Sequence, residues 1–151
     1  MTETETDLIR FVDAQAQVYS QVVNELTDGH KRTHWMWFIF PQLSSLGHSA
    51  MAQRYAIRDM NQARRYLADP MLGDRLRHDV RLIVSHKGKS ALEIFGSPDD
   101  LKFRSCITLF YEAASDQSDR SLFALAAILQ RRGGSPDPRI TPAQITLFWV
   151  I

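Results

Sequence analysis

Apolar residues recur at intervals of three and four along most of the chain, which is the spacing of one buried helix face. The first such stretch predicts a helix over residues 7–27, which Thr6 or Asp7 caps and Gly29 ends. Prolines and glycines divide the rest into shorter helices. We expect these from Ser49 through Ile57, from Asp59 to Pro70, from Asp69 to Gly88, for one turn between Ser90 and Gly96, from Pro98 through Ala114, and over residues 119–131.

Most of the predicted helices begin at a side chain that accepts hydrogen bonds from first-turn amides. Two starts also have the spacing of a capping box, in which the residue three positions later bonds back to the cap. Proline in a first turn costs little, because its missing N–H would have no partner there. The predicted caps are Ser49, Asp59 with Gln62, Asp69 before Pro70, Ser90 with Glu93, and Ser97 before Pro98.

One stretch does not show helical spacing. Residues 34–42 read HWMWFIFPQ, six consecutive apolar residues between polar neighbours. We expect Met36 to Phe40 to be an extended strip that threads between helices, and Ile145 to Ile151 to be a second extended run. The predicted fold class is therefore all-α, mainly α: a compact single-domain bundle of six or seven helices with a buried aromatic extended segment.

The length of 151 residues fits one domain, which we assign to residues 7–141, between a flexible acidic N-terminus at residues 1–6 and an apolar C-terminal tail at residues 142–151. A chain of this length buries roughly 70% of its unfolded surface, so it needs no disulfide or metal to fold. Hydrophobic residues make up 44% and charged residues 23%, an ordinary globular balance that argues against disorder of the whole chain.

Charge and cysteine content limit the classes of partner. The chain has 18 Lys and Arg against 17 Asp and Glu, and this balance argues against a nucleic-acid binder. The single cysteine, Cys106, suits a reducing compartment. The N-terminal TETETD lacks the basic and apolar regions of a signal peptide, and the apolar run from Trp35 to Phe40 is far shorter than the ~20 residues of a membrane span. We expect a cytoplasmic protein without a membrane partner, either a monomer or a homodimer.

Several stretches together resemble one family of bacterial proteins. They are RFVDAQ at 10–15, GHKRTHWMWFIFPQ at 29–42, LGHS at 46–49, RYAI at 54–57, ARRYLADPMLGDRL at 63–76, IFGSPDDLKFRSCITLF at 94–110 and PDPRIT at 136–141. With these stretches the chain is similar to the domain-of-unknown-function family 1810 (DUF1810), some of whose members carry the misleading label calpastatin. The resemblance implies a compact, mostly helical, cytoplasmic protein and implies no activity.

The chain departs from the family pattern at two places. Cys106 stands where that pattern more often has a serine, which weakens any role for a hydroxyl group at this position. The C-terminal ITLFWVI is unusually apolar for a chain end, which suggests that it packs into the core or against a neighbour.

The aromatic run supplies the first candidate site. Two tryptophans would wall a cleft, and His34 and Gln42 would provide donors and acceptors at its rim. Core packing is the simpler interpretation, and we favour it for Trp37 and Phe38. His34, Trp35 and Gln42 suit a site as well as they suit the core, because buried polar groups need partners.

The predicted helix start after Ser97 supplies the second candidate site. Asp99 and Asp100 are adjacent carboxylates that would act as a general base or bind a metal or a ribose. Helix capping explains both without a ligand, and we favour that interpretation. Lys102 and Ser105 lie three residues apart, so they share a helix face and would meet a ligand together.

Two other patterns point less strongly to a site. His30 and His34 have a metal-ligand spacing, but no third ligand accompanies them, so we predict no metal and no cofactor. Residues 54–89 hold nine Arg or Lys against four Asp, an excess that would attract phosphate or an acidic partner. A solvated face is the simpler interpretation, with the arginines paired at helical spacing to Asp59, Asp69, Asp74 and Asp79.

Cys106 falls on the apolar face of its predicted helix and is interpreted as an inert buried thiol. The chain has no nucleophile-elbow motif, P-loop or Gly-x-Gly-x-x-Gly motif. Sequence motifs therefore name no reaction.

The sequence is therefore compatible with three functional hypotheses. The first is a small sugar- or nucleotide-like ligand in an aromatic and acidic pocket, bound by Trp35, Trp37, Gln42, Lys102 and Ser105. An enzyme at this site would be a hydrolase with an Asp general base and His34, Asp99 and Asp100 as catalytic candidates. The alternative is a protein-interaction module without catalysis that uses the apolar C-terminus or the basic helix face. Nucleic-acid binding ranks last on charge.

Overall fold

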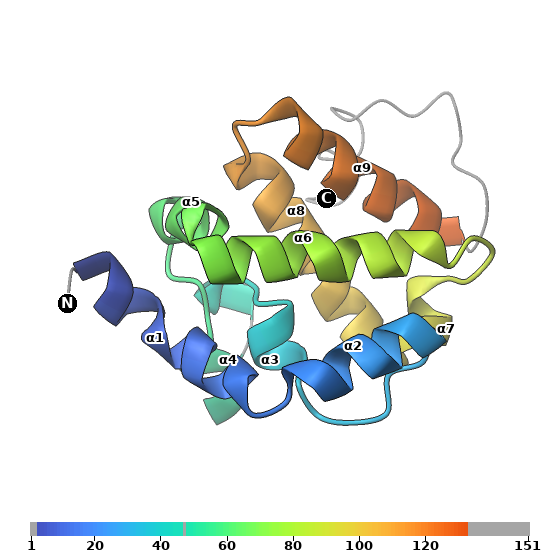
Figure 1. Cartoon of the computed structure of the whole chain (residues 1–151), viewed down its shortest axis with the longest axis horizontal. Helices are drawn as coiled ribbons and strands as arrows, with labels where there is room; N and C mark the ends of the chain where they lie inside the picture. The colour runs from blue at the N-terminus through green and yellow to red at the C-terminus, as the bar shows by residue number, and fades with distance from the viewer. Residues whose placement is uncertain (1–2, 47, 133–151) are drawn as a thin grey trace.

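The computed structural model of the chain describes residues 3–46 and 48–132, and that part is built from nine α-helices and one 3₁₀ helix (Figure 1). A single isolated parallel β-bridge, between Leu43 and Ile57, is the only strand-like pairing within these residues. The elements are α1 (Glu3–Ala16), α2 (Tyr19–Asp28), α3 (Met36–Ile39), η1 (Ser44–Leu46), α4 (Ala50–Arg54), α5 (Met60–Ala68), α6 (Pro70–Ser85), α7 (Ala91–Phe95), α8 (Asp99–Ala113) and α9 (Gln117–Arg132).

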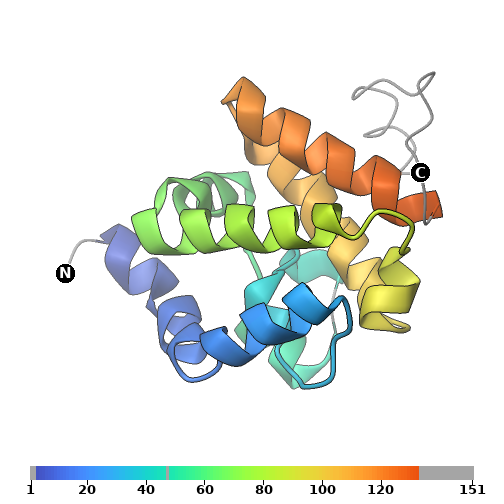
Figure 2. The same cartoon turned by 45° about the vertical axis from the view of Figure 1, so that its right-hand side comes forward.

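Helix α6 crosses the middle of the molecule and contacts α1, α2, α5 and α9 (Figure 1). Helices α8 and α9 lie side by side as an antiparallel pair, and α8 also packs against α5, α7 and α3 (Figure 2). Helices α1 and α2 follow one another along the opposite side of α6. The all-α prediction is confirmed, with more and shorter helices than the six or seven expected.

Aromatic rings fill the centre of this arrangement. The Phe40 ring packs edge-on against Phe95 and Phe103, with ring centroids 5.7 and 5.1 Å apart, and Trp35 lies 6.2 Å from Phe40. These edge-to-face contacts add to the free energy gained from burying the rings. The run at residues 35–40 is therefore the place where the N-terminal helices meet α7 and α8.

The extended segment predicted at Met36 to Phe40 is wrong, because residues 36–39 form one turn of α-helix. The amides of Ile39 and Phe40 donate to the carbonyls of Trp35 and Met36, so the turn satisfies backbone groups that an unpaired strand would leave buried. The turn also points Trp37 away from its buried neighbours. Trp35, Met36, Phe38, Ile39 and Phe40 are all buried, whereas Trp37 is only half-buried.

The single helix predicted over residues 7–27 is also wrong. The helical segment begins at Glu3 and divides at Val18, whose φ and ψ of −129° and −2° are not helical. The buried Gln15 side chain lies just before the division and donates to the Phe38 carbonyl and the Tyr66 hydroxyl. The division lets α1 pack on α3 while α2 packs on α6.

Most of the predicted caps are present. Asp69 accepts from two first-turn amides of α6, and Ser49 caps α4, which ends at Arg54 rather than Ile57. Ser90 and Glu93 form a complete capping box. Asp59 accepts from the Gln62 amide as predicted.

Two of the predicted capping interactions are wrong. The Gln62 side chain bonds the amide of Arg58 instead of returning to Asp59. Ser97 does not cap α8, whose N-cap position is Pro98 without a side-chain cap bond. The first turn of α8 carries Asp99 and Asp100 as predicted.

A buried carboxylate fixes the loop between α2 and α3. Glu25 is fully buried and accepts hydrogen bonds from the Thr33 amide and hydroxyl, the Arg32 amide, the Gln21 amide group and the Trp35 indole. Burial by itself would raise the pKa of Glu25, but the bonds from Thr33, Arg32 and Gln21 outweigh it and lower the pKa to about 2. The charged carboxylate therefore holds Trp35 and the loop in place.

The run predicted at Ile145 to Ile151 lies outside the described residues, as does the tail assigned to residues 142–151. Within the described residues, no helix combines the length and apolar character that crossing a membrane requires.

Candidate functional site

A groove of about 420 Å³ lies between α4, the segment that precedes it, and the first half of α8. We call it the α4–α8 groove. The β-bridge helps to form its wall, because the Ile57 amide donates to the Gln42 carbonyl and fixes the chain where it leaves α3. The groove is lined by Gln42, Leu46, His48, Ser49, Ala52, Pro98, Leu101, Lys102 and Ser105.

A second, much smaller hollow shares Gln42, Ala52 and Lys102 with the groove and extends to Trp37 and Tyr55. Lys102 lies where the two meet, and its ammonium nitrogen is 5.4 Å from the centroid of the Trp37 ring. A cation at this distance from an indole face is attracted by the ring's negative quadrupole. Trp37, which is half-buried at the edge of the core, therefore has the Lys102 ammonium over its ring, beside the groove.

Asp99 connects Lys102 to a second lysine. Its Oδ1 atom lies 3.4 Å from the Lys102 ammonium and its Oδ2 atom lies 2.9 Å from the Lys31 ammonium. The Lys31 side chain is only 8% exposed, and its ammonium lies 5.2 Å from the Trp35 ring centroid. We call these three residues the Lys31–Asp99–Lys102 triad, which has two positive charges and one negative charge.

The groove itself is neutral to basic. Lys102 supplies a positive charge and His48 an imidazole, and none of the lining residues is acidic. The Ser105 hydroxyl donates to the Leu101 carbonyl, and the Ser49 hydroxyl accepts from the Ala52 amide. Leu46 and Leu101 are 52% and 53% exposed, so the groove also has apolar edges.

The structure brings together four of the residues proposed from the sequence and separates the others. Trp37, Gln42, Lys102 and Ser105 line the α4–α8 groove or the adjoining hollow. Trp37, for which core packing was the favoured interpretation, lines the hollow, and Trp35, which suited either role, is 1% exposed in the core.

The three catalytic candidates do not line the groove. His34 is exposed at the surface, three residues from the Lys31 that pairs with Asp99. Asp99 is engaged by two lysines. The Oδ1 atom of Asp100 is buried and has no hydrogen-bond partner within the described part of the chain. The pairing of Asp99 gives it an ion-pairing role in addition to its place in the first turn of α8.

Five residues at or behind the groove were not proposed as site residues from the sequence. They are Lys31, Leu46, His48, Ser49, which was predicted only as a helix cap, and Leu101. The LGHS stretch at residues 46–49 was a signal, since it belongs to the resemblance, but nothing local gave it a role. Lys31 also belongs to a family stretch, at residues 29–42, but its partner Asp99 is 68 positions away in the sequence, so no local pattern pairs the two.

His30 and His34 are both exposed. Over residues 3–46 and 48–132, no three or more His, Cys, Asp or Glu side chains lie in positions to hold a metal ion. Cys106 is buried as predicted, and burial raises the pKa of its thiol.

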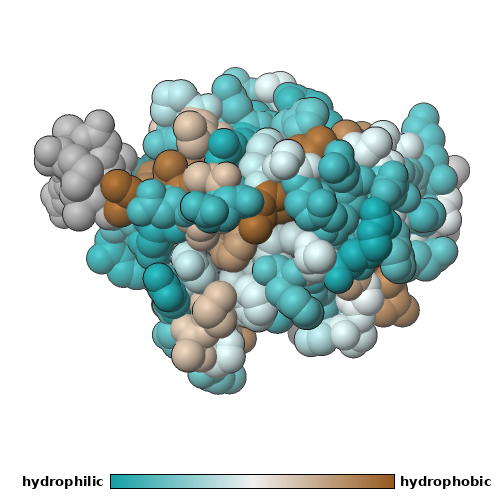
Figure 3. Space-filling view, turned by 60° about the horizontal axis from the view of Figure 1, so that its bottom comes forward, coloured by the Kyte–Doolittle hydropathy of each residue, from teal (hydrophilic) through white to brown (hydrophobic). Residues whose placement is uncertain are grey.

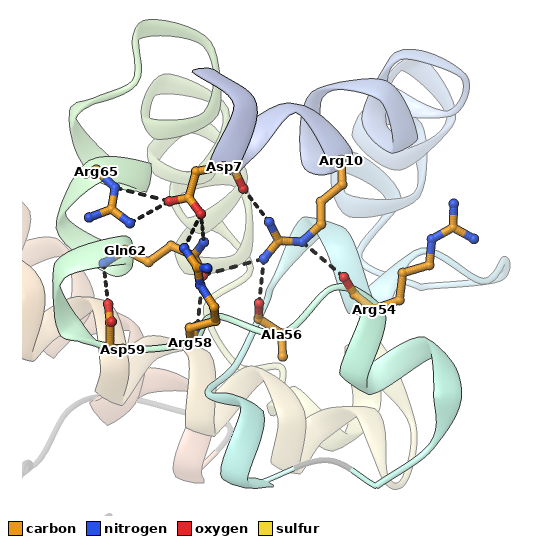
Figure 4. Close-up of polar contacts among 8 residues, drawn as sticks. All are labelled: Asp7, Arg10, Arg54, Ala56, Arg58, Asp59, Gln62 and Arg65. Carbon is orange, nitrogen blue, oxygen red and sulfur yellow. Dashed lines mark hydrogen bonds and ion pairs between the residues drawn. The ribbon is translucent and has the colours of Figure 1, made fainter. Parts of the chain in front are cut away.

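Two arginines from residues 54–89, Arg58 and Arg65, belong to a second polar cluster, where side chains of α1 and α5 meet (Figure 4). Asp7 accepts from Arg58, Arg65 and the Gln62 side chain. Burial opposes ionisation of Asp7, but the hydrogen bond from Arg65 and the charges of Arg58 and Arg65 lower its pKa. Arg10 donates to the backbone carbonyls of Arg54 and Ala56, as Figure 4 also shows.

Most of the Arg–Asp ion pairs that we predicted at helical spacing within residues 54–89 are wrong. Of the four aspartates expected as partners, only Asp74 pairs with an arginine at that spacing, with Arg77. Arg77 makes its shorter contact with Asp119 of α9, 2.7 Å away. Asp59 and Asp69 cap helices instead. Arg65 and Arg77 instead form ion pairs between helices, with Asp7 of α1 and Asp119 of α9. Their positive charges are therefore already paired and attract a phosphate less.

Of the large exposed hydrophobic side chains on the described surface, Leu46 and Leu101 line the α4–α8 groove and the other five do not. Together the seven belong to α1, η1, α4, α6, α7, α8 and α9. The face in Figure 3 is mostly hydrophilic and shows small separate hydrophobic patches. That face does not present a broad apolar docking surface.

Comparison with known proteins places the chain in a family. DUF1810, described as a protein of unknown function, matches residues 5–141. The crystal structure of a conserved hypothetical protein from Mycobacterium tuberculosis is similar, with 45% sequence identity, a TM-score of 0.79, and coverage of 93% of this chain and 95% of that chain. No curated protein matches. The resemblance seen in the sequence is thus confirmed, and the chain belongs to the DUF1810 family.

Proposed function

We propose that the protein binds a small organic anion, of the nucleotide type, in the α4–α8 groove. The observation that carries the proposal is the position of Lys102, whose ammonium lies between the groove and the exposed side of the aromatic run. A positive charge that is held beside an aromatic ring, in a groove without acidic lining residues, favours an anion.

The lining residues suit the two parts of such a ligand. Leu46, Leu101 and the Trp37 ring offer apolar contacts to a flat body. Lys102 and His48 offer polar contacts to a phosphate or a carboxylate. A neutral sugar is supported less well, because the carboxylates that would bind its hydroxyl groups do not line the groove.

The proposal is for binding and does not include a catalytic step. Both groove serines interact with the backbone, Ser105 as a donor to Leu101 and Ser49 as an acceptor from Ala52. Asp99, the candidate general base, does not line the groove and pairs with Lys31 and Lys102 instead.

Thermal unfolding with nucleoside monophosphates and with the matching nucleosides tests the proposal. A ligand that binds only the folded state at 100 times its Kd stabilises the protein by about 2.7 kcal/mol. We expect the monophosphates to raise the Tm more than the nucleosides do. The Lys102→Met variant, which keeps the length of the side chain and removes its charge, should lose most of the difference.

Lys87→Met is the matched control. Lys87 is exposed in the turn between α6 and α7, so this variant changes the net charge equally without touching the groove. It should respond to monophosphates as the wild type does. If no monophosphate raises the Tm, or if Lys102→Met responds fully, the proposed function is wrong.

A further inference from the structure

We infer that Lys31, which does not line the groove, sets the groove's preference for anions by neutralising Asp99. The inference rests on the proposed function in one respect, namely that an anion is the ligand. It makes Lys31 and Asp99 positioning residues, since they would act through Lys102 rather than touch the ligand.

The geometry places Asp99 between two competing cations. Lys31 makes the closer contact, at 2.9 Å, and Lys102 the longer one, at 3.4 Å. The Asp99 side chain is 19% exposed, so solvent screens these contacts only in part. Both oxygens are used, one for each lysine.

Lys31 is held where it cannot leave this contact easily. Its side chain is 8% exposed, its amide donates to the Ile94 carbonyl at 2.8 Å, and its ammonium lies beside the Trp35 ring. The Trp35 indole in turn donates to the buried Glu25 carboxylate at 3.2 Å. Lys31 therefore has a fixed position behind the groove.

Removal of Lys31 or Asp99 changes the net charge of the triad beside the groove. With Lys31 present, the two lysines and Asp99 sum to +1, and Lys102 can offer its charge to a ligand. Without Lys31, Asp99 would face Lys102 alone, the sum would be zero, and an incoming anion would meet an already neutralised lysine. Without Asp99, the sum would be +2.

Two variants with opposite expected effects test the inference by binding. Lys31→Met should weaken monophosphate binding by roughly two- to fivefold at low salt and leave nucleoside binding unchanged. Asp99→Asn should strengthen monophosphate binding by a similar factor. Lys31→Arg keeps the charge and should behave as the wild type, which separates the charge from any loss of packing.

A measurement without a nucleotide tests the same inference separately. Iodide is an anionic quencher of tryptophan fluorescence and acrylamide a neutral one, and Trp37 is the half-buried tryptophan beside Lys102. In a Trp149→Phe background, with Trp35 shielded in the core, Lys31→Met should lower iodide quenching roughly twofold at low ionic strength and leave acrylamide quenching unchanged. Asp99→Asn should raise iodide quenching.

The two measurements separate the two ideas. If the wild type binds no nucleotide, but Lys31→Met lowers and Asp99→Asn raises iodide quenching as expected, the proposed function is wrong and the role of Lys31 is supported. Equal changes with iodide and acrylamide would mean that Lys31→Met opens the structure, and the inference would be wrong. Loss of monophosphate binding in Asp99→Asn would also overturn it, because Asp99 would then be needed to orient Lys102.

Discussion

Asp79 is a buried carboxyl group on α6 that has few partners. It is 1% exposed and accepts a hydrogen bond of 3.0 Å from the Tyr19 hydroxyl at the start of α2. Arg75 lies nearby, with its guanidinium over the Tyr19 ring. Burial raises the pKa of Asp79 to about 7, although the Tyr19 hydroxyl and the Arg75 charge oppose it. Asp79 therefore contrasts with Glu25, whose more numerous hydrogen bonds overcome burial.

This raised pKa predicts a pH dependence of stability. Between about pH 4 and pH 7 the folded protein keeps a proton on Asp79 that the unfolded chain has lost, so its contribution to stability falls as the pH rises. Above pH 7 the penalty is complete. Asp79→Asn removes the penalty, so urea unfolding should show the variant more stable than the wild type at pH 8, by about 2 kcal/mol or more, and less so at pH 5.

Asp74→Asn provides the comparison for Asp79. Asp74 lies on the same helix, but its side chain is 80% exposed and contacts Arg77 at 3.4 Å. Its replacement should change stability little, and by the same amount at both pH values. An Asp79→Asn variant with an equal effect at pH 5 and pH 8 would show that Asp79 is charged throughout this range.

At the scale of elements, the contact between α5 and α6 depends on a glycine. Gly73 is buried in the first turns of α6, and a Cβ atom there would lie 2.1 Å from the Leu67 carbonyl oxygen at the end of α5. That carbonyl also accepts a hydrogen bond of 3.1 Å from Arg77. Because the obstacle is backbone, a side chain at position 73 must move the two helices apart.

We expect Gly73→Ala to destabilise the protein by about 1–3 kcal/mol in urea unfolding, through overpacking of the α5–α6 contact. Helix propensity alone predicts the opposite sign, because alanine is favoured over glycine within a helix by about 1 kcal/mol. His78→Ala, at an exposed position on the same helix, should stay within about 0.5 kcal/mol of the wild type. If Gly73→Ala is more stable than the wild type, the α5–α6 contact does not exclude a side chain at position 73.

At the scale of the whole molecule, one continuous core joins the helices. The N-terminal helices contribute Phe11 and Leu26 to it, the aromatic turn contributes Phe40, and α8 and α9 contribute Phe110 and Phe123. Phe11 contacts Tyr66 of α5, and Tyr66 contacts Phe110, so the rings link elements that are far apart in sequence. No described helix has a separate core of its own that would let it unfold alone.

A shared core predicts a single cooperative unfolding transition. Urea denaturation followed by far-UV circular dichroism, which reports helix, and by near-UV circular dichroism, which reports packed aromatic rings, should give coincident curves. A near-UV signal that is lost at a lower urea concentration would show that part of the core separates first. The division of the chain into one domain at residues 7–141 stays a prediction until that measurement is made.

Local chemistry made several features predictable from the sequence. Gly29 adopts the left-handed conformation that ends α2, with a φ of 72°, and Asp69 and Ser90 cap the helices that follow them. Each of these features depends on residues within about four positions of one another, so spacing alone reveals it. Lys102 and Ser105 were placed on one helix face for the same reason, and the groove contains both.

Features that depend on distant residues could not be predicted in this way. The division at Val18 lies in a stretch without glycine or proline. Both α1 and α2 pack on α6, and α1 also packs on α3. The partners of the Asp7 carboxylate lie more than fifty positions away, on the segment before α5 and on α5 itself. A spacing rule cannot foresee them, because the chain brings them together only by folding.

The sequence by itself determined that the chain is helical, where most helices begin and end, and which family it belongs to, because periodicity, caps and family stretches are local patterns. The tertiary structure alone decided that Trp35 is buried in the core and that Trp37, in the helical turn at Met36–Ile39, lines the hollow beside the groove. It also decided that Asp99 lies between Lys31 and Lys102. Such placements are set by the free energy of packing the whole core, to which every helix contributes and which no single stretch of sequence contains.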